Sequence, residues 1–155
     1  AGAPKTRVVI DGRGIVPETH RVFDDAAPTL VATTDTSPRE RREAWAAAGA
    51  DVVVLDDAGS GLIPIDRLVA ELGKRDMQHV LLEGGPTIAW EAIDRGVVDR
   101  VVLFIAPILV GGQDAPSVLM GGGVPGIGKA VRLRLTQVIR IGDDIKVVAD
   151  VHRHR

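Results

Sequence analysis

The sequence contains no cysteine among its 155 residues. Disulfide bonds, thiolate metal sites and thiol nucleophiles are therefore excluded as sources of stability or chemistry. A chain without disulfides is compatible with a reducing compartment, and we expect the protein to be cytoplasmic. Whatever chemistry the chain performs has to come from other side chains or from a bound cofactor.

The sequence is also poor in aromatic residues and in net charge. Aromatic residues make up 3% of the chain, which leaves few side chains to stack on single-stranded nucleic acid. Nineteen Lys and Arg residues oppose 21 Asp and Glu residues, so the formal charge of −2 creates no overall field for nucleic acid or anionic lipid. No apolar run approaches the roughly 18 residues of a membrane span. We expect binding to neither nucleic acid nor membranes.

The remaining composition, 45% hydrophobic and 26% charged, is typical of a globular protein, and the length suits a single domain over residues 1–155. In the first half, runs rich in β-branched residues predict strands, and helical spacing of apolar residues predicts the helices between them. Ser37 followed by Pro38 is a typical helix start. The predicted strands cover residues 7–10, 28–33 and 51–55, and the predicted helices cover residues 39–48 and 65–73.

The second half begins with a predicted buried strand that runs through two glycines into a helix. A further strand and a glycine-rich stretch follow, and two alternating runs separated by Gly142-Asp143-Asp144 predict a closing C-terminal β-hairpin. The order of elements indicates an α/β fold with a mostly parallel sheet flanked by helices. The predicted strands cover residues 79–82, 100–106, 131–140 and 145–151, and the predicted helix covers residues 87–95.

The junction between the strand at residues 79–82 and the next helix is the most informative segment. Helix N-termini present unpaired N–H groups and a positive dipole end, and Gly84 and Gly85 lack the Cβ atoms that would hold a pyrophosphate away from the backbone. Thr87 adds a hydroxyl donor. Glu83 stands beside this predicted anion site, where an unpaired buried carboxylate would be costly without a ligand. The alternatives are a tight turn without ligand and a solvated loop carboxylate at Glu83.

Four segments together resemble the pyrimidine reductases of riboflavin biosynthesis, whose domain has a dihydrofolate-reductase-like fold. The resemblance spans nearly the whole chain, and the order and spacing of the segments both match. It implies reduction of the ribosylamino group of a pyrimidine 5′-phosphate to ribitylamino, with hydride from NADPH and no metal. The matching segments are VVIDGR at residues 8–13, LEGGPT at 82–87, GVVD at 96–99 and IAPILVGG at 105–112.

The resemblance also implies roles for individual residues. It assigns Glu83 to contact with the substrate, where we hypothesise a catalytic role in stabilising the cation of the opened ribosylamine. It puts Gly12 and Arg13 near the cofactor. It places the pyrophosphate of NADPH on the turn formed by Gly84, Gly85, Pro86, Thr87 and Ile88.

Three further residues are candidates for the 2′-phosphate of NADPH. Thr33 and Thr34 end the second predicted strand, where hydroxyl groups approach that phosphate in the dihydrofolate reductase pattern; the alternative is bonding to local backbone. Arg13 offers a charged planar fork suited to phosphate, with a solvated loop arginine as the alternative. The four histidines show no metal-ligand spacing, so we expect no metal site.

The sequence differs from the family's pattern at its N-terminal end. The family's reductase domain begins with a strand, a helix and a loop that do not precede Arg7, so we expect a domain incomplete at its N-terminus with an open sheet edge. A homodimer is expected, and a fused or associated N-terminal deaminase domain is compatible with the sequence. The alternatives for function are a dihydrofolate reductase and a non-catalytic nucleotide-binding or oligomerisation module.

Overall fold

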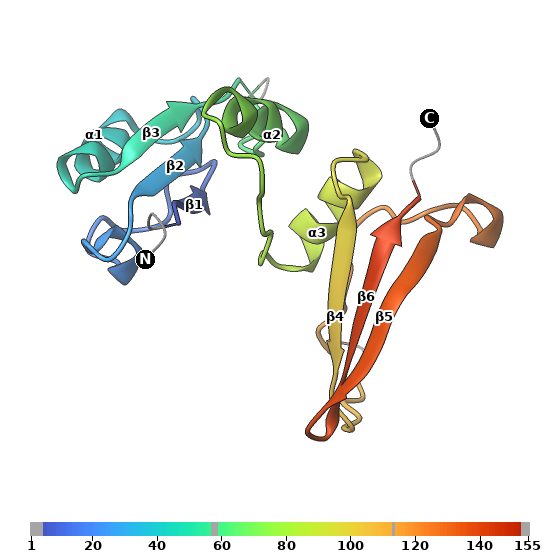
Figure 1. Cartoon of the computed structure of the whole chain (residues 1–155). Coiled ribbons are helices and arrows are strands. Elements are labelled where there is room, and N and C mark those ends of the chain that lie inside the picture. Colours follow the sequence, from blue (N-terminus) through green and yellow to red (C-terminus); the bar gives the residue numbers. More distant parts are fainter. Residues whose placement is uncertain (1–4, 57–58, 113, 153–155) are drawn as a thin grey trace. The chain divides into compact units, whose positions relative to one another are not determined.

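The computed structural model describes residues 5–56, 59–112 and 114–152. The chain divides into two compact units, Ala1–Gln78 and His79–Arg155, and each unit contains its own three-stranded sheet (Figure 1). Compactness alone does not establish independent folding, so the single domain over residues 1–155 stays a prediction.

The first unit is built on a parallel sheet in the order β1-β2-β3. The strands are β1 (Arg7–Ile10), β2 (Thr29–Thr33) and β3 (Asp51–Val54), and the helices are α1 (Arg39–Ala47) and α2 (Ile65–Lys74), with a short 3₁₀ helix at Arg21–Phe23. The predicted strands and helices of this half are confirmed, each to within one residue at either end. Parallel strands joined by crossover segments confirm the predicted α/β organisation.

The core of the first unit lies around the central strand β2, every residue of which is buried. Trp45 of α1 is fully buried against Val31 and Ala50, and its indole N–H donates to the carbonyl oxygen of Val16 at 2.9 Å. A large buried aromatic side chain with its polar atom satisfied contributes both apolar area and a fixed orientation. Trp45 therefore ties α1 both to the sheet and to the loop that follows β1.

Arg75, at the end of α2, connects this helix to the sheet. Its guanidinium donates to Glu71 of the same helix at 3.0 Å and to Asp51 at the start of β3. The same guanidinium holds the pKa of Glu71 below its usual range, with Lys74 contributing in the same direction. The charged end of α2 is thereby fixed beside the first residue of β3.

The second unit is built on an antiparallel sheet in the order β4-β6-β5. Strands β5 (Leu133–Ile141) and β6 (Asp144–Val151) form the predicted C-terminal hairpin, with Ile141 opposite Asp144, and β4 (Arg100–Ile105) pairs with the other edge of β6. Helix α3 (Pro86–Asp94) precedes β4, and a 3₁₀ helix covers Ile127–Lys129. The predicted strand at 100–106 is confirmed, although its partner is the antiparallel β6.

The predicted buried strand at residues 79–82 is wrong. These residues have no regular secondary structure and are exposed, with 77% of Leu81 and 53% of Val80 accessible to solvent. A strand forms only where a neighbouring strand accepts its backbone hydrogen bonds, and no strand in the described part of the chain pairs with this segment. The apolar pattern predicted a strand, but such a pattern does not show whether a partner strand is present.

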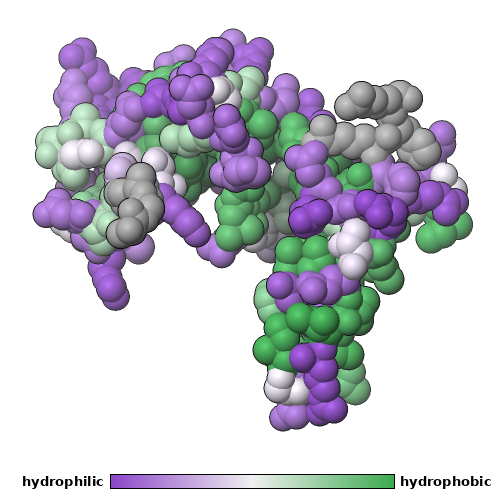
Figure 2. Space-filling view, in the orientation of Figure 1, coloured by the Kyte–Doolittle hydropathy of each residue, from purple (hydrophilic) through white to green (hydrophobic). Residues whose placement is uncertain are grey.

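The sheet of the second unit exposes many apolar side chains, and Figure 2 shows hydrophobic residues gathered over its strands. On one face, side chains from all three strands are neighbours in the register, and the exposed members include Leu135 and Val138 of β5 and Ile105 of β4. Contiguous exposed apolar surface is typical of a face that is covered in an assembly. This surface is in line with the predicted homodimer, which stays a prediction.

The helices of this structure are short. No helix formed by the described residues is long and apolar enough to cross a membrane.

Candidate functional site

The residues predicted for the site lie in both units. Four of them belong to the first unit: Gly12 and Arg13 follow β1, Thr33 is the last residue of β2, and Thr34 follows it. Glu83 and the turn from Gly84 to Ile88 belong to the second unit, where they lead into α3. In open parallel sheets, ligands bind outside the carboxyl ends of the strands, and helix N-termini bind anions.

Thr33 and Thr34 hold the loop that follows β1. The hydroxyl of Thr33 donates to the carbonyl oxygen of Asp11 and that of Thr34 donates to the carbonyl oxygen of Gly12, each at 2.7 Å. Both threonines are fully buried. A ligand has no access to either hydroxyl in this arrangement, so their part in cofactor binding stays a prediction and the structure supports only an indirect form of it.

Ser37 does not cap α1, contrary to its predicted role. Pro38 occupies the N-cap position and makes no side-chain cap bond, while the hydroxyl of Ser37 donates to the carbonyl oxygen of Thr34 at 3.0 Å. Ser37 is buried, and its hydroxyl bonds to the backbone of the turn after β2 in place of the helix N–H groups. The first turn of α1 is left without a side-chain cap.

Asp11 is a site residue that sequence reasoning missed. Its buried carboxylate accepts backbone N–H groups from Arg13 at 3.3 Å, Gly14 at 2.9 Å and Val16 at 2.6 Å. In the sequence, Asp11 was used only as the end of the first strand and as part of the segment VVIDGR at residues 8–13, with no role of its own. Aspartate at the start of a glycine-containing loop is also typical of a side chain that bonds to the backbone ahead of it, and this signal was available.

Gly12 and Arg13 lie where the loops after β1 and β3 meet. A Cβ atom on Gly12 would lie 2.3 Å from the carbonyl oxygen of Gly61, so close backbone approach requires glycine there. The side chain of Arg13 passes over Gly61, and the residue is exposed. Its guanidinium makes no hydrogen bond or ion pair with residues 5–56, 59–112 or 114–152. Arg13 therefore presents a free cation at the carboxyl edge of the parallel sheet.

The turn before α3 leaves its N–H groups available. Gly85 is the N-cap residue and provides no side chain, the first turn contains no acidic residue, and Pro86 at the first helical position has no N–H to satisfy. The N–H groups that open a helix have no intrahelical partner, and the helix dipole makes this end positive. The Thr87 side chain is exposed and has no hydrogen-bond partner in the part of the chain that is described.

The two glycines of this turn have different surroundings. A Cβ atom on Gly84 would lie 2.3 Å from Cγ2 of Ile88, so packing of Ile88 on the turn requires glycine at this position. A Cβ atom on Gly85 would meet no atom within 4 Å. Gly85 has φ −68° and ψ 174°, which every residue adopts. Neither packing nor backbone conformation explains Gly85, which leaves open space above the helix N-terminus.

Glu83 is exposed, and its carboxylate has no partner in the described part of the chain. The buried strand that was expected to desolvate this carboxylate does not form, so the argument from burial does not apply to this structure. Its assignment to substrate contact stays a prediction from the resemblance.

The glycine-rich loop that contains Met120 and Gly121 contacts the first turn of α3. The sequence alone gave this loop no role. The N–H of Met120 donates to the carbonyl oxygen of Pro86 at 3.1 Å. Gly121 packs on the indole of Trp90, since a Cβ atom there would lie 2.4 Å from Cδ1 of the ring. The loop therefore supports the first turn of α3.

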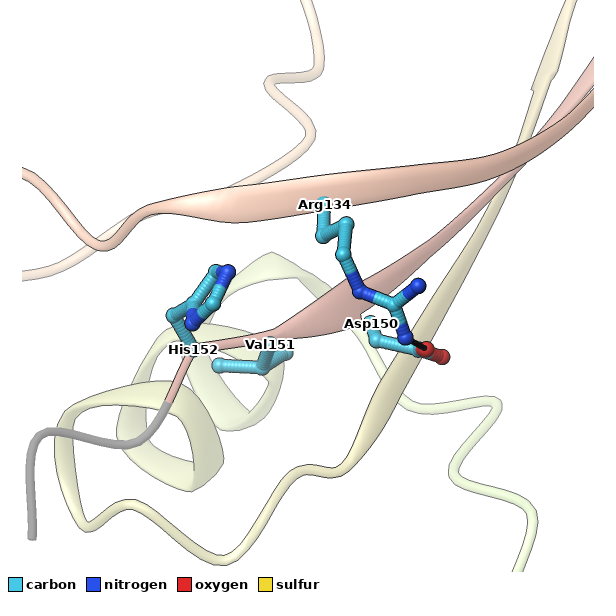
Figure 3. A pocket seen from close by; sticks show the side chains of 4 residues that line it. All are labelled: Arg134, Asp150, Val151 and His152. Atoms are coloured by element: carbon cyan, nitrogen blue, oxygen red, sulfur yellow. Dashed lines mark hydrogen bonds and ion pairs between the residues drawn. The ribbon is translucent and has the colours of Figure 1, made fainter.

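A separate hollow in the second unit contains none of the predicted site residues. Arg134, Asp150, Val151 and His152 line it (Figure 3). The carboxylate of Asp150 accepts from Arg134 at 2.6 Å and from Arg100 at 2.9 Å, and both arginines stand opposite it in the register of the sheet. This network is explained by cross-strand pairing of β4, β6 and β5. His152 is exposed, and in the described ranges no three His, Asp or Glu residues are grouped as metal ligands.

Comparisons with known proteins agree with these features. Residues 3–147 match the model of the RibD C-terminal domain family. The 2,5-diamino-6-ribosylamino-4(3H)-pyrimidinone 5′-phosphate reductase of Methanothermobacter thermautotrophicus is 34% identical over 146 residues, which cover 94% of this chain and 66% of that protein. The riboflavin biosynthesis protein RibD of Bacillus amyloliquefaciens is 33% identical over 159 residues, which cover 96% of this chain and 42% of that protein.

Solved structures show the same fold. RibD of Acinetobacter baumannii matches with a TM-score of 0.77 at 24% identity, covering 94% of this chain and 37% of that chain. A pyrimidine reductase-like protein of Corynebacterium diphtheriae matches with a TM-score of 0.76 at 20% identity, covering 94% of this chain and 60% of that chain.

The chain spans less than two thirds of the length of both relatives, 66% of one and 42% of the other. The match nevertheless runs through both units and includes the segments 8–13 and 82–87 that carry the candidate site. On this coverage, the chain belongs to the RibD C-terminal domain family.

Proposed function

We propose that this chain is the NADPH-binding reductase part of an enzyme that converts the ribosylamino group of a pyrimidine 5′-phosphate to ribitylamino in riboflavin biosynthesis. The observation that carries the proposal is the open N-terminus of α3, where no atom of the described residues lies within 4 Å of a Cβ placed on Gly85. The names of the relatives support the same reaction class, because they describe pyrimidinone phosphate reductases and riboflavin biosynthesis proteins.

The candidate residues at the N-terminus of α3 and the guanidinium of Arg13 each suit one part of an anionic dinucleotide. At α3, unpaired N–H groups, the Thr87 hydroxyl and the uncovered Gly85 suit a pyrophosphate, which binds readily at helix N-termini. At the carboxyl edge of the parallel sheet, the free guanidinium of Arg13 suits a further phosphate such as the 2′-phosphate that distinguishes NADPH from NADH. Both features concern binding and orientation.

The chemistry follows from this division of roles. When bound, NADPH supplies the hydride. Opening of the ribosylamine breaks the bond between C1 and the ring oxygen, which takes up a proton, and leaves a positively charged C1=N group on the substrate. The carboxylate of Glu83 would stabilise this positive charge, and the turn at Gly84 and Gly85 would hold the cofactor. Addition of the hydride to C1 would complete the ribityl chain.

The activity test uses the full chain with NADPH and a phosphoribosylamino-pyrimidine, and it follows loss of the reduced nicotinamide. We expect NADPH oxidation that depends on this substrate. Turnover with dihydrofolate that methotrexate abolishes would instead identify a dihydrofolate reductase. NADPH binding without turnover of either substrate would identify a non-catalytic nucleotide-binding module.

The two neighbouring glycines allow binding to be separated from stability. We expect Gly85→Ala to lower NADPH affinity about 10-fold, because the new methyl group occupies the space of the pyrophosphate, while the free energy of unfolding stays within about 1 kcal/mol of that of the unaltered protein. Gly84→Ala is the matched control. It should lower the free energy of unfolding by about 1–3 kcal/mol, because its methyl group collides with Ile88.

Calorimetric titration with NADPH and urea unfolding measure the two quantities. If Gly85→Ala binds NADPH as tightly as the unaltered chain, the pyrophosphate does not lie on this turn.

A further inference from the structure

Buried side chains hold six backbone groups of the loop that follows β1. The carboxylate of Asp11 accepts three N–H groups, at residues 13, 14 and 16, while Thr33 and Thr34 bind the carbonyl oxygens of residues 11 and 12. At the far end of the loop, the indole of Trp45 binds the carbonyl oxygen of Val16. A loop fixed in this way has one conformation, unlike most surface loops.

Asp11 is the organising residue of this loop. It is 6% exposed, and its two carboxylate oxygens accept from three backbone N–H groups, so its hydrogen bonds are directed to the loop. One of the three donors is the N–H of Arg13 itself. The side chain that leaves the loop at this point is the free guanidinium of Arg13, which passes over Gly61 and out to solvent.

We propose that Asp11 is a positioning residue that sets the preference of this protein for NADPH over NADH by fixing the backbone of Arg13. This inference rests on the proposed function, since it takes Arg13 as the contact to the 2′-phosphate. A long arginine side chain binds a phosphate well only when its starting point is fixed, because ordering it otherwise costs conformational entropy. The buried carboxylate removes that cost for the backbone before the ligand arrives.

The direction of the change in NADPH affinity when the charge of Asp11 is removed distinguishes two mechanisms. By electrostatics alone, removing a negative charge near a phosphate site should tighten the binding of a phosphate. If Asp11 acts by holding the loop, its removal should weaken that binding instead, because an amide at this position replaces one acceptor oxygen by a donor that faces N–H groups. The two mechanisms therefore predict opposite changes in NADPH affinity.

The experiment measures the dissociation constants of NADPH and NADH for the full chain by calorimetry and compares four proteins with the unaltered one. Arg13→Gln should reduce the preference for NADPH about 10-fold or more, because it removes a charge-assisted contact. Asp11→Asn should reduce it about 3- to 10-fold and leave NADH affinity within about 2-fold. The double variant should be no worse than Arg13→Gln alone, because Asp11 acts through Arg13.

Asp35→Asn is the matched control. Asp35 lies at the same edge of the sheet and pairs with Arg42 at 3.4 Å. It makes no hydrogen bond to residues 11–16 of the loop after β1, so the variant removes the same charge without releasing that loop. It should leave the preference for NADPH unchanged or slightly increased.

The outcomes separate the two proposals. If the unaltered chain binds neither nucleotide, the proposed function fails and this inference with it. If Arg13→Gln reduces the preference and Asp11→Asn does not, only the role of Asp11 is overturned. If Asp11→Asn weakens both nucleotides equally, Asp11 supports the fold alone. Should Asp11→Asn not fold, Asp11→Ser, which keeps one acceptor, replaces it, and failure of both to fold overturns the proposal.

Discussion

Replacing Glu83 by Gln should lower turnover about 100-fold or more while NADPH affinity changes by less than about 2-fold. The substitution keeps the shape and exposure of the side chain and removes only its charge. In the proposed reaction, positive charge develops on the substrate when the ribosylamine opens, and the carboxylate of Glu83 stabilises that charge in the transition state. Interactions made only in the transition state change turnover and leave cofactor binding unaffected.

The control for Glu83 is Glu91→Gln. Glu91 lies on α3, where its carboxylate pairs with Arg95 at 2.8 Å on the helix surface, so its neutralisation changes the local charge equally without touching the turn. Stopped-flow turnover and calorimetric NADPH binding should both be close to normal in this variant. Equal losses of turnover and NADPH affinity in Glu83→Gln would show that Glu83 acts on the cofactor and would overturn its catalytic role.

The second large effect is on stability. Trp45→Ala should lower the free energy of unfolding by about 3–5 kcal/mol, the range for removal of a buried tryptophan or phenylalanine side chain. Trp45 is fully buried between α1 and the parallel sheet, and its loss leaves a cavity against Val31 and frees the carbonyl oxygen of Val16. The measurement is urea unfolding followed by far-ultraviolet circular dichroism, because the variant lacks the tryptophan that fluorescence would report.

Trp45→Phe separates the two contributions of this side chain. It keeps most of the apolar volume and removes the indole N–H, so it should cost about 1–3 kcal/mol, the range for an unsatisfied buried polar group. A cost below about 1 kcal/mol for Trp45→Ala would contradict the packing described for the first unit.

The elements of the first unit could be predicted because their signals are local. The strands β1, β2 and β3 are short apolar runs bounded by turn residues, and β2 is buried along its whole length, so an unbroken run of apolar and threonine residues marks it clearly. The hairpin of β5 and β6 could also be predicted, because a short turn that includes Gly142 separates the two alternating runs.

The segment at residues 79–82 shows where local pattern is insufficient. Val80, Leu81 and Leu82 have the composition of a buried strand, yet whether they form one depends on a partner strand that the pattern does not contain. The predicted desolvation of Glu83 depended on the same strand and was lost with it. A local sequence pattern does not show which distant strands will pair with a given segment.

The sequence predicted the residues of a candidate site but not their individual contacts. Gly84 and Gly85 are the same residue type in adjacent positions, and only the structure shows that Ile88 packs on the first and that the second is open. Thr33 and Thr34 were expected to face a ligand, whereas their hydroxyls bind the loop carbonyls beneath Arg13. The direction in which a short polar side chain bonds depends on neighbours brought together by the fold.

The most direct test of the account is calorimetric titration of the full chain with NADPH and, in parallel, with NADH. The central proposal is that the open turn at Gly85 binds the pyrophosphate of NADPH and that the guanidinium of Arg13 binds its 2′-phosphate. We predict one NADPH bound per chain, with NADH bound at least about 10-fold more weakly because it lacks the phosphate that Arg13 contacts. Absence of binding by both nucleotides would contradict the claim.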